Sequence, residues 1–171
     1  MKTNHITFAL AIALTLGSWA DISAADKSGL KDSDVNFIKQ AGAAGTAEVK
    51  LATLGTQKAE RADVRDLAKM LVTDHTAVNA ELTTLAQTKG VELSAVIDPK
   101  AAENFQDLEK ESGKDFDKAF LSQLEKSHKT SISAFEDAEK NAEDGDVKAF
   151  ARKTLPSLKA HLTQVKDLES K

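Results

Sequence analysis

DVRDLAKMLVTDHTAVNAELTTLAQTK, residues Asp63 to Lys89, is the segment from which we infer the architecture of this chain. Its apolar residues recur at the spacing of one face of an α-helix. They are Val64, Leu67, Leu71, Val78, Leu82 and Leu85. His75 lies inside this apolar stripe, so the segment predicts an amphipathic helix that carries one imidazole on its buried face.

A later segment repeats the beginning of this helix. Asp146–Arg152 matches Asp63–Lys69 at Asp, Val and Ala, and basic residues coincide at two further positions. The same sequence offset pairs Asp34, Phe37, Ile38 and Gln40 with Asp117, Phe120, Leu121 and Gln123. One offset thus relates two pairs of helices, which predicts two helical hairpins of similar structure.

Capping and breaking residues divide the chain into four long helices and one short helix. The expected long helices cover about 34–59, 63–89, 115–142 and 146–168, and the short one covers about 101–110. Their expected N-caps include Ser33 or Asp34, Asp63 and Asp146. Gly90 is expected to end the second helix. Pro156 is expected to kink the last helix one turn before His161.

The lengths of the connections select the topology. Residues 60–62 form a short turn, so the first two helices should pack antiparallel, whereas 91–114 is far longer than a tight turn requires. The sequence therefore predicts an all-α, ferritin-like four-helix bundle of two repeated αα-hairpins, joined by a long crossover with a short extra helix. An up-down-up-down bundle would need a short second connection, and a strict coiled coil would need uninterrupted heptads. No segment shows the alternation of a β-strand.

Residues 1–25 have the three regions of a secretory signal peptide: Lys2, an apolar run over 6–16, and a tract of small residues. We expect cleavage after Ala25, with Ala20 as the second site, and a bundle domain over 26–171. The apolar run is too short to span a bilayer, and charges interrupt the later apolar runs, so no transmembrane helix is expected. The chain has no cysteine for a disulfide or a lipid anchor. These features predict a soluble periplasmic or secreted protein.

The charge pattern excludes some classes of partner. Lys and Arg total 23 against 27 Asp and Glu, and the two signs are interspersed. A nucleic-acid-binding protein needs a basic stripe, so we expect no nucleic-acid partner. The chain lacks tyrosine, and its one tryptophan, Trp19, lies in the predicted signal peptide, which leaves little for stacking on bases or sugars. An envelope protein partner and the oligomeric state stay open.

Four polar residues fall on the apolar stripes of the four long helices. They are Glu48, His75, His128 and His161. Counted from the first hairpin turn at about 1.5 Å per residue, Glu48 and His75 lie at a similar depth. If the crossover returns the chain to that end of the bundle, His128 comes to a similar depth and His161 to within a turn or two of it. We interpret them as candidate ligands of one metal ion.

Two carboxylates could complete or orient this set. Asp74 precedes His75, and Glu125 lies three residues before His128 on the same side of its helix. Imidazoles with carboxylates suit zinc, iron, copper or nickel, and the sequence does not rank these metals. The alternative is a buried histidine–carboxylate network that fixes helix register and holds no ligand. Both hypotheses predict burial, so burial does not separate them.

A di-iron centre fits the sequence less well. It requires Glu on each of two helices and Glu-x-x-His on each of the other two. Glu125-Lys126-Ser127-His128 provides one such unit, but Leu158 stands three residues before His161. The chain also has no Gly-x-Ser-x-Gly elbow and no glycine-rich phosphate loop. The pattern favours a non-catalytic protein.

Several segments resemble a bacterial protein family. They are Phe37–Glu48, Val64–His75, Phe116–His128 and Lys153–His161. The resemblance covers about 33–168 and is most specific at Asp74-His75 and Thr154-Leu155-Pro156. The family is a ferritin-like domain of unknown function, commonly labelled "predicted outer membrane protein". It implies an exported helical bundle of the bacterial envelope and implies no activity.

The sequence thus predicts an exported helical bundle with an accessory or stress-related role in the envelope. The alternative is a bundle that binds a single transition-metal ion through Glu48, His75, His128 and His161. A further alternative, from another class, is a ferritin-like redox enzyme or ferroxidase.

Overall fold

The computed structural model describes residues 29–94 and 99–171. Within these ranges it contains five helices and no strand. The helices are α1 (Asp32–Lys58), α2 (Ala62–Lys89), α3 (Pro99–Lys110), α4 (Gly113–Asn141) and α5 (Gly145–Glu169). Their order and bounds confirm the predicted ferritin-like four-helix bundle with one short extra helix. The predicted signal peptide and both cleavage sites lie outside the described residues.

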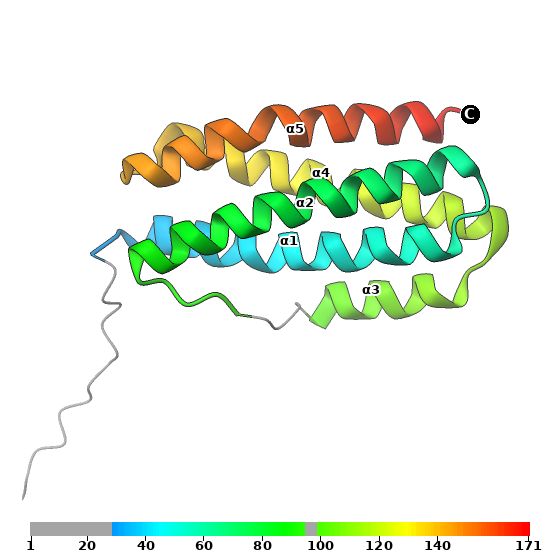
Figure 1. The fold of residues 1–171 in the computed structure, drawn as a ribbon, viewed down its shortest axis with the longest axis horizontal. Helices are drawn as coiled ribbons and strands as arrows, with labels where there is room; N and C mark the ends of the chain where they lie inside the picture. Colours follow the sequence, from blue (N-terminus) through cyan, green and yellow to red (C-terminus); the bar gives the residue numbers. More distant parts are fainter. Residues whose placement is uncertain (1–28, 95–98) are drawn as a thin grey trace, which may run out of the picture.

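The two hairpins pack side by side with one long crossover between them (Figure 1). α1 packs against α2 and α4 against α5, while α1 also contacts α4 and α2 contacts α5. After α2 the chain passes along the bundle through α3, so that α4 begins at the end where α1 turns into α2 (Figure 1). The connection from α2 to α4 is long because it returns the chain to that end of the bundle (Figure 1).

The helix ends agree with the expectation at one position and differ at others. Gly90 ends α2 with a left-handed φ of 71°, as expected for a glycine C-cap. Asp63 and Asp146 are not N-caps, because α2 and α5 begin earlier, after Arg61 and Asp144. The Asp144 carboxylate accepts the backbone N–H groups of Asp146 and Val147. α5 continues through Pro156 from Gly145 to Glu169.

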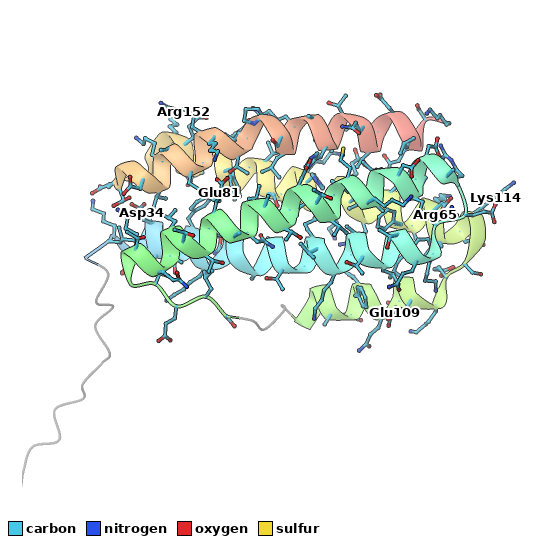
Figure 2. The ribbon with its side chains drawn as sticks, viewed as in Figure 1. Asp34, Arg65, Glu81, Glu109, Lys114 and Arg152 are labelled. Carbon is cyan, nitrogen blue, oxygen red and sulfur yellow. The ribbon has the colours of Figure 1, made fainter. Side chains whose placement is uncertain are left out.

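The N-cap of α1 also differs from the expectation, for a tertiary reason. α1 begins after Lys31 with no side-chain cap. Asp34 is buried and instead accepts the backbone N–H groups of Glu143 and Asp144, at 3.1 and 2.8 Å, in the turn between α4 and α5. Figure 2 shows Asp34 at that end of the bundle.

Asp117, the repeat partner of Asp34, does the same for the other hairpin. Its carboxylate accepts the N–H groups of Glu60 and Arg61, at 3.0 and 2.9 Å, in the turn between α1 and α2. The first helix of each hairpin thus closes the turn of the other hairpin. This exchange ties the two repeats together at both ends of the bundle.

Replacing Asp34 or Asp117 by alanine is expected to lower the free energy of unfolding by about 2–3 kcal/mol each, because two buried N–H groups lose a charged acceptor. Urea denaturation measures this loss. Asp66→Ala is the matched control, since the Asp66 side chain is 71% exposed and pairs only with Lys69 one turn along α2. A loss at Asp34 no greater than at Asp66 would contradict the tertiary capping role.

The core is divided into two apolar clusters. One lies towards the α1–α2 turn and includes Leu51, Leu67, Phe116, Phe120 and Val165. The other lies towards the α4–α5 turn and includes Val35, Phe37, Phe135, Val147 and Phe150. Between them, buried polar side chains interrupt the hydrophobic packing, and these are Glu48, His75, His128 and His161.

Candidate metal centre

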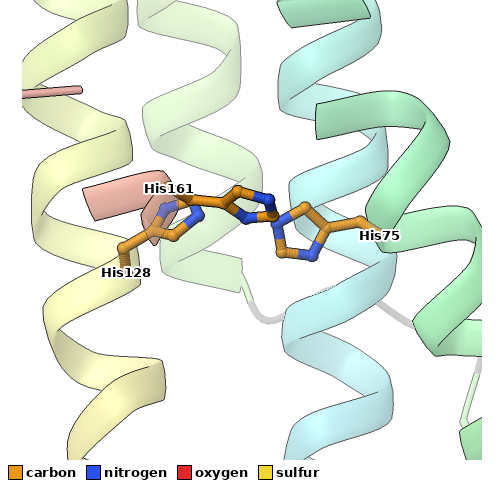
Figure 3. Close-up of side chains that lie close together, drawn as sticks. All are labelled: His75, His128 and His161. Carbon is orange, nitrogen blue, oxygen red and sulfur yellow. The ribbon is translucent and has the colours of Figure 1, made fainter. Parts of the chain in front are cut away.

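Three imidazoles from three helices meet in the polar layer between the two apolar clusters (Figure 3). His75 comes from α2, His128 from α4 and His161 from α5. The ring centroids are 5.4 Å apart for His75–His128 and His75–His161, and 5.6 Å apart for His128–His161. One ring nitrogen from each histidine lies within 4.8 Å of the other two. We call these three side chains the imidazole triad.

Two rings of the imidazole triad are held in place by hydrogen bonds on their outer nitrogens. The His128 Nδ1–H donates to the carbonyl oxygen of Leu124 at 2.9 Å. The His161 Nε2–H donates to Asp74 Oδ2 at 3.0 Å. A carbonyl and a carboxylate oxygen can only accept, so each of these nitrogens carries the proton. The other nitrogen of each ring, His128 Nε2 and His161 Nδ1, therefore keeps its lone pair.

Those two nitrogens and Nε2 of His75 are buried and have no hydrogen-bond partner among the residues that the structure describes. A ring fixed through one nitrogen, with the other left free, is the arrangement in which histidines bind metals. In a structural network, by contrast, buried polar atoms are almost always paired. The imidazole triad thus presents three buried, unpartnered ring nitrogens, and on His128 and His161 these are the nitrogens that keep the lone pair.

Burial also sets the protonation of the imidazole triad. Loss of solvent, reinforced by the neighbouring His128 and His161, lowers the pKa of His75 from 6.5 to about 3. Burial lowers the pKa of His161 as well, although its hydrogen bond to Asp74 acts in the opposite direction. Both rings are neutral at pH 7, which is the form that binds a metal ion.

Glu48 lies beside the imidazole triad, but it is not among the side chains whose candidate ligand atoms lie close to one another. It is 4% exposed, and its Oε1 is 3.9 Å from Nδ1 of His128. Because that nitrogen donates to Leu124, the contact is not a hydrogen bond. Within residues 29–94 and 99–171, Oε2 of Glu48 has no hydrogen-bond partner. Burial raises the pKa of Glu48, while the neighbouring His128 acts to lower it.

The two candidate supporting carboxylates have different positions. Asp74 orients His161 across the α2–α5 interface, and its side chain is 44% exposed. Glu125 does not support His128: it pairs with Lys129 at 2.8 Å, and that hydrogen bond lowers the pKa of Glu125. The sequence reasoning missed the Leu124 carbonyl, although its position four residues before His128 is the helical spacing at which a side chain can reach a backbone acceptor.

Fold and site together define a class: a ferritin-like helical bundle whose core contains a cluster of three imidazoles. The chain matches the family described as "Domain of unknown function (DUF4142)" over residues 20–168, and it belongs to that family. This confirms the resemblance to a bacterial domain of unknown function. No curated protein sequence matches the chain significantly.

Solved structures of similar fold are known. CopM in its Cu(II)-bound form has a TM-score of 0.68 and 19% identity, with 80% of this chain and 95% of CopM covered. CopM in its Cu(I)-bound form has a TM-score of 0.67 and 21% identity over the same shares. A DUF305 fragment from Deinococcus radiodurans has a TM-score of 0.74 and 13% identity, covering 82% of this chain and 97% of the fragment. These likenesses establish a shared fold.

No helix in residues 29–94 and 99–171 combines the length and the apolar character needed to cross a membrane. The absence of a nucleic-acid partner stays a prediction.

Proposed function

We propose that this protein is an exported bundle that binds one copper ion through His75, His128 and His161 and holds or carries it without catalysis. The single observation that carries the proposal is the set of three unpartnered, buried imidazole nitrogens in the imidazole triad. The N-terminal pattern of residues 1–25 supports the exported location.

The energetics favour a ligand over a purely structural network. A buried polar group without a hydrogen bond costs about 1–3 kcal/mol in proteins, and the imidazole triad contains three such nitrogens. Apolar residues of similar volume could fix the helix register at a smaller cost in folding free energy. A metal ion bonded to all three nitrogens would satisfy every one of these lone pairs at once.

The donor set favours copper among the four candidate metals. It consists of three neutral nitrogens, and for such donors the divalent series places Cu(II) above nickel, iron and zinc. The bundles of similar fold include CopM in Cu(I)-, Cu(II)- and Ag-bound forms. An ion about 2.0–2.1 Å from each nitrogen holds the nitrogens about 3.5 Å apart, so the rings close by roughly 1 Å from separations of up to 4.8 Å.

A di-iron oxidase is supported less well by the same geometry. Glu125, the acidic member of the one Glu-x-x-His unit, points to Lys129 on the outside of α4. Among the described residues, Glu48 is then the one carboxylate buried beside the imidazole triad, and two iron ions bound by carboxylates need several.

The test is a titration of the untagged protein with Cu(II), with Cu(I) under reducing conditions, and with Zn(II), against a chromophoric chelator of known affinity. We expect one tightly bound copper per chain and weaker binding of zinc. Metal analysis after gel filtration gives the stoichiometry. A protein that retains no copper, or that retains zinc more tightly than copper, would contradict the proposal.

A further inference from the structure

The imidazole triad is closed off along the axis of the bundle. His75, His128 and His161 are 6%, 1% and 4% exposed, and an apolar cluster lies on either side of them. An ion that reaches these rings must therefore pass sideways between two helices. Asp74 meets the His161 ring from α2, and Glu48 lies against the His128 ring from α1, so these two side chains mark two lateral approaches to the imidazole triad.

The approach between α2 and α5 is blocked by the hydrogen bond between Asp74 and His161. Asp74 Oδ2 is already engaged with the Nε2–H of His161, and this bond fixes the ring so that Nδ1 is free. An ion passing between α2 and α5 at this level would have to break that bond and move the ring. Entry between α2 and α5 would thus displace the His161 ring to which the ion is expected to bind.

The Glu48 face is open. A groove of about 830 Å³ runs between α1, α3 and α4, and Glu48 is part of its lining. Small side chains of α1 keep it open, and these are Ala43, Ala44 and Ala47. Ser127 lines the groove from α4, directly before His128 in the sequence. The groove thus brings solvent-accessible space up to the side chain next to the imidazole triad.

Glu48 combines the features of a relay between this groove and the imidazole triad. Its carboxylate is buried, its Oε2 has no partner, and its Oε1 lies 3.9 Å from the outer edge of the His128 ring. A carboxylate is a harder ligand than imidazole, so it can replace a water of a hydrated cation and then give the ion up to nitrogen donors. Lys50 and Lys126 in the lining are balanced by Glu109 and Glu48, so the groove as a whole does not repel a cation.

We propose that the metal ion enters and leaves the imidazole triad through the α1–α3–α4 groove, with Glu48 as the first protein ligand that it meets. The step is a ligand exchange without redox change: a water leaves the hydrated cation, a Glu48 oxygen takes its place, and the imidazole nitrogens then displace that oxygen. This inference rests on the proposed copper site and adds the route to it.

The test compares rates of copper transfer in two matched variants. Ala44 and Ala160 are both exposed helical alanines, one in the groove and one on α5 beside His161. Because neither is a ligand, Ala44→Phe should slow both Cu(II) uptake and release to excess chelator by about tenfold or more and leave Kd within about twofold, while Ala160→Phe keeps wild-type rates. Stopped-flow absorbance of the Cu(II)–imidazole bands measures both rates.

Glu48→Gln tests the relay itself. This change keeps the shape of the groove and removes the charge, so Cu(II) uptake should slow by about tenfold in the full chain. Wild-type rates in Ala44→Phe, or slowing in Ala160→Phe instead, would overturn the groove as the route. Unchanged uptake in Glu48→Gln would overturn the relay. Failure of the wild-type chain to bind copper at all would be a different result, because it would remove the proposed function and not the route alone.

Discussion

His128→Ala is expected to weaken copper binding by about three orders of magnitude or more. Replacing a residue that only orients a metal ligand typically costs about 10–100-fold in affinity, so removing one of three ligands should cost more. His128 is the most enclosed member of the imidazole triad, at 1% exposed, and water cannot easily take its place. Competition with a chelator measures the affinity.

Stability gives a second readout of the same loss. Copper at about 1,000 times its Kd stabilises the wild-type fold by roughly 4 kcal/mol, because the ion binds the folded state alone. The variant should gain almost nothing at that copper concentration. His128→Leu serves beside the alanine variant, since an apolar side chain of closer volume keeps the layer packed. Urea denaturation with and without copper shows whether the fold is intact.

Asp74→Asn and Lys129→Ala are the matched controls for this loss. Asp74 acts through His161, so its replacement should cost about 10–100-fold in copper affinity, between the wild type and the ligand variants. Lys129 adjoins His128 but is exposed and pairs with Glu125, so its replacement should leave the affinity unchanged. Equal affinities in His128→Leu and the wild type would show that copper binds elsewhere.

The internal repeat predicted the scaffold well, and the reason is physical. Both hairpins bury their apolar stripes against each other, so the pattern of spacing records the packing. The local sequence could not predict the hydrogen bonds of Asp34 and Asp117, because each carboxylate accepts backbone N–H groups from the turn of the other hairpin. The expected caps Asp63 and Asp146 were wrong for the related reason that a sequence pattern does not distinguish an N-cap from a residue of the first turn.

The site departs from the repeat. At the offset that relates the hairpins, Gly45 corresponds to His128, Leu158 to His75, and Val78 to His161. A Cβ on Gly45 would lie 1.9 Å from Oδ1 of Asn79, so this position is filled by a neighbour where its counterpart carries an imidazole. The imidazole triad thus breaks the repeat, with one histidine from the first hairpin and two from the second, so the symmetry of the scaffold could not have revealed it.

Helical spacing placed the three histidines on buried faces but could not assign the roles of the carboxylates. Glu125 and His128 are three residues apart, yet Glu125 turns towards Lys129 because that pairing is available at the surface. Asp74 is next to His75 in the sequence but orients His161, from the other hairpin. Such contacts depend on how two helices approach each other, which no single helix pattern contains.

Titration of His75 is expected to cost the metal-free protein roughly 3 kcal/mol of stability between pH 7 and pH 4. The pKa of His75 is about 3 in the folded state and 6.5 in the unfolded state. Between these values the unfolded chain binds a proton that the folded chain does not bind, and this favours unfolding. Stability is complete above pH 6.5 and falls as the pH is lowered towards 3, by about 1.4 kcal/mol per pH unit. His161, whose pKa is also lowered, acts in the same direction.

Titration of Glu48 should change the stability of the fold in the opposite direction. Its folded pKa is raised above 4.5, so its contribution to stability is present below pH 4.5 and is lost as the pH rises through the folded value. Urea midpoints of the metal-free wild type, His75→Leu and Glu48→Gln from pH 4 to pH 8 separate the two effects. His75→Leu should flatten the acid side, and Glu48→Gln should be more stable than the wild type at pH 8 by about 1–3 kcal/mol.

These two variants also connect stability with the proposed function. Each variant removes a buried polar group that has an unpartnered atom. His75→Leu should therefore stabilise the metal-free fold at acid pH, and Glu48→Gln should stabilise it at pH 8. Both variants should also weaken or slow the binding of copper. A site kept for helix register alone predicts the reverse, because its loss would destabilise the fold at every pH. A loss of stability in both variants across the whole pH range would therefore count against a metal centre in this bundle.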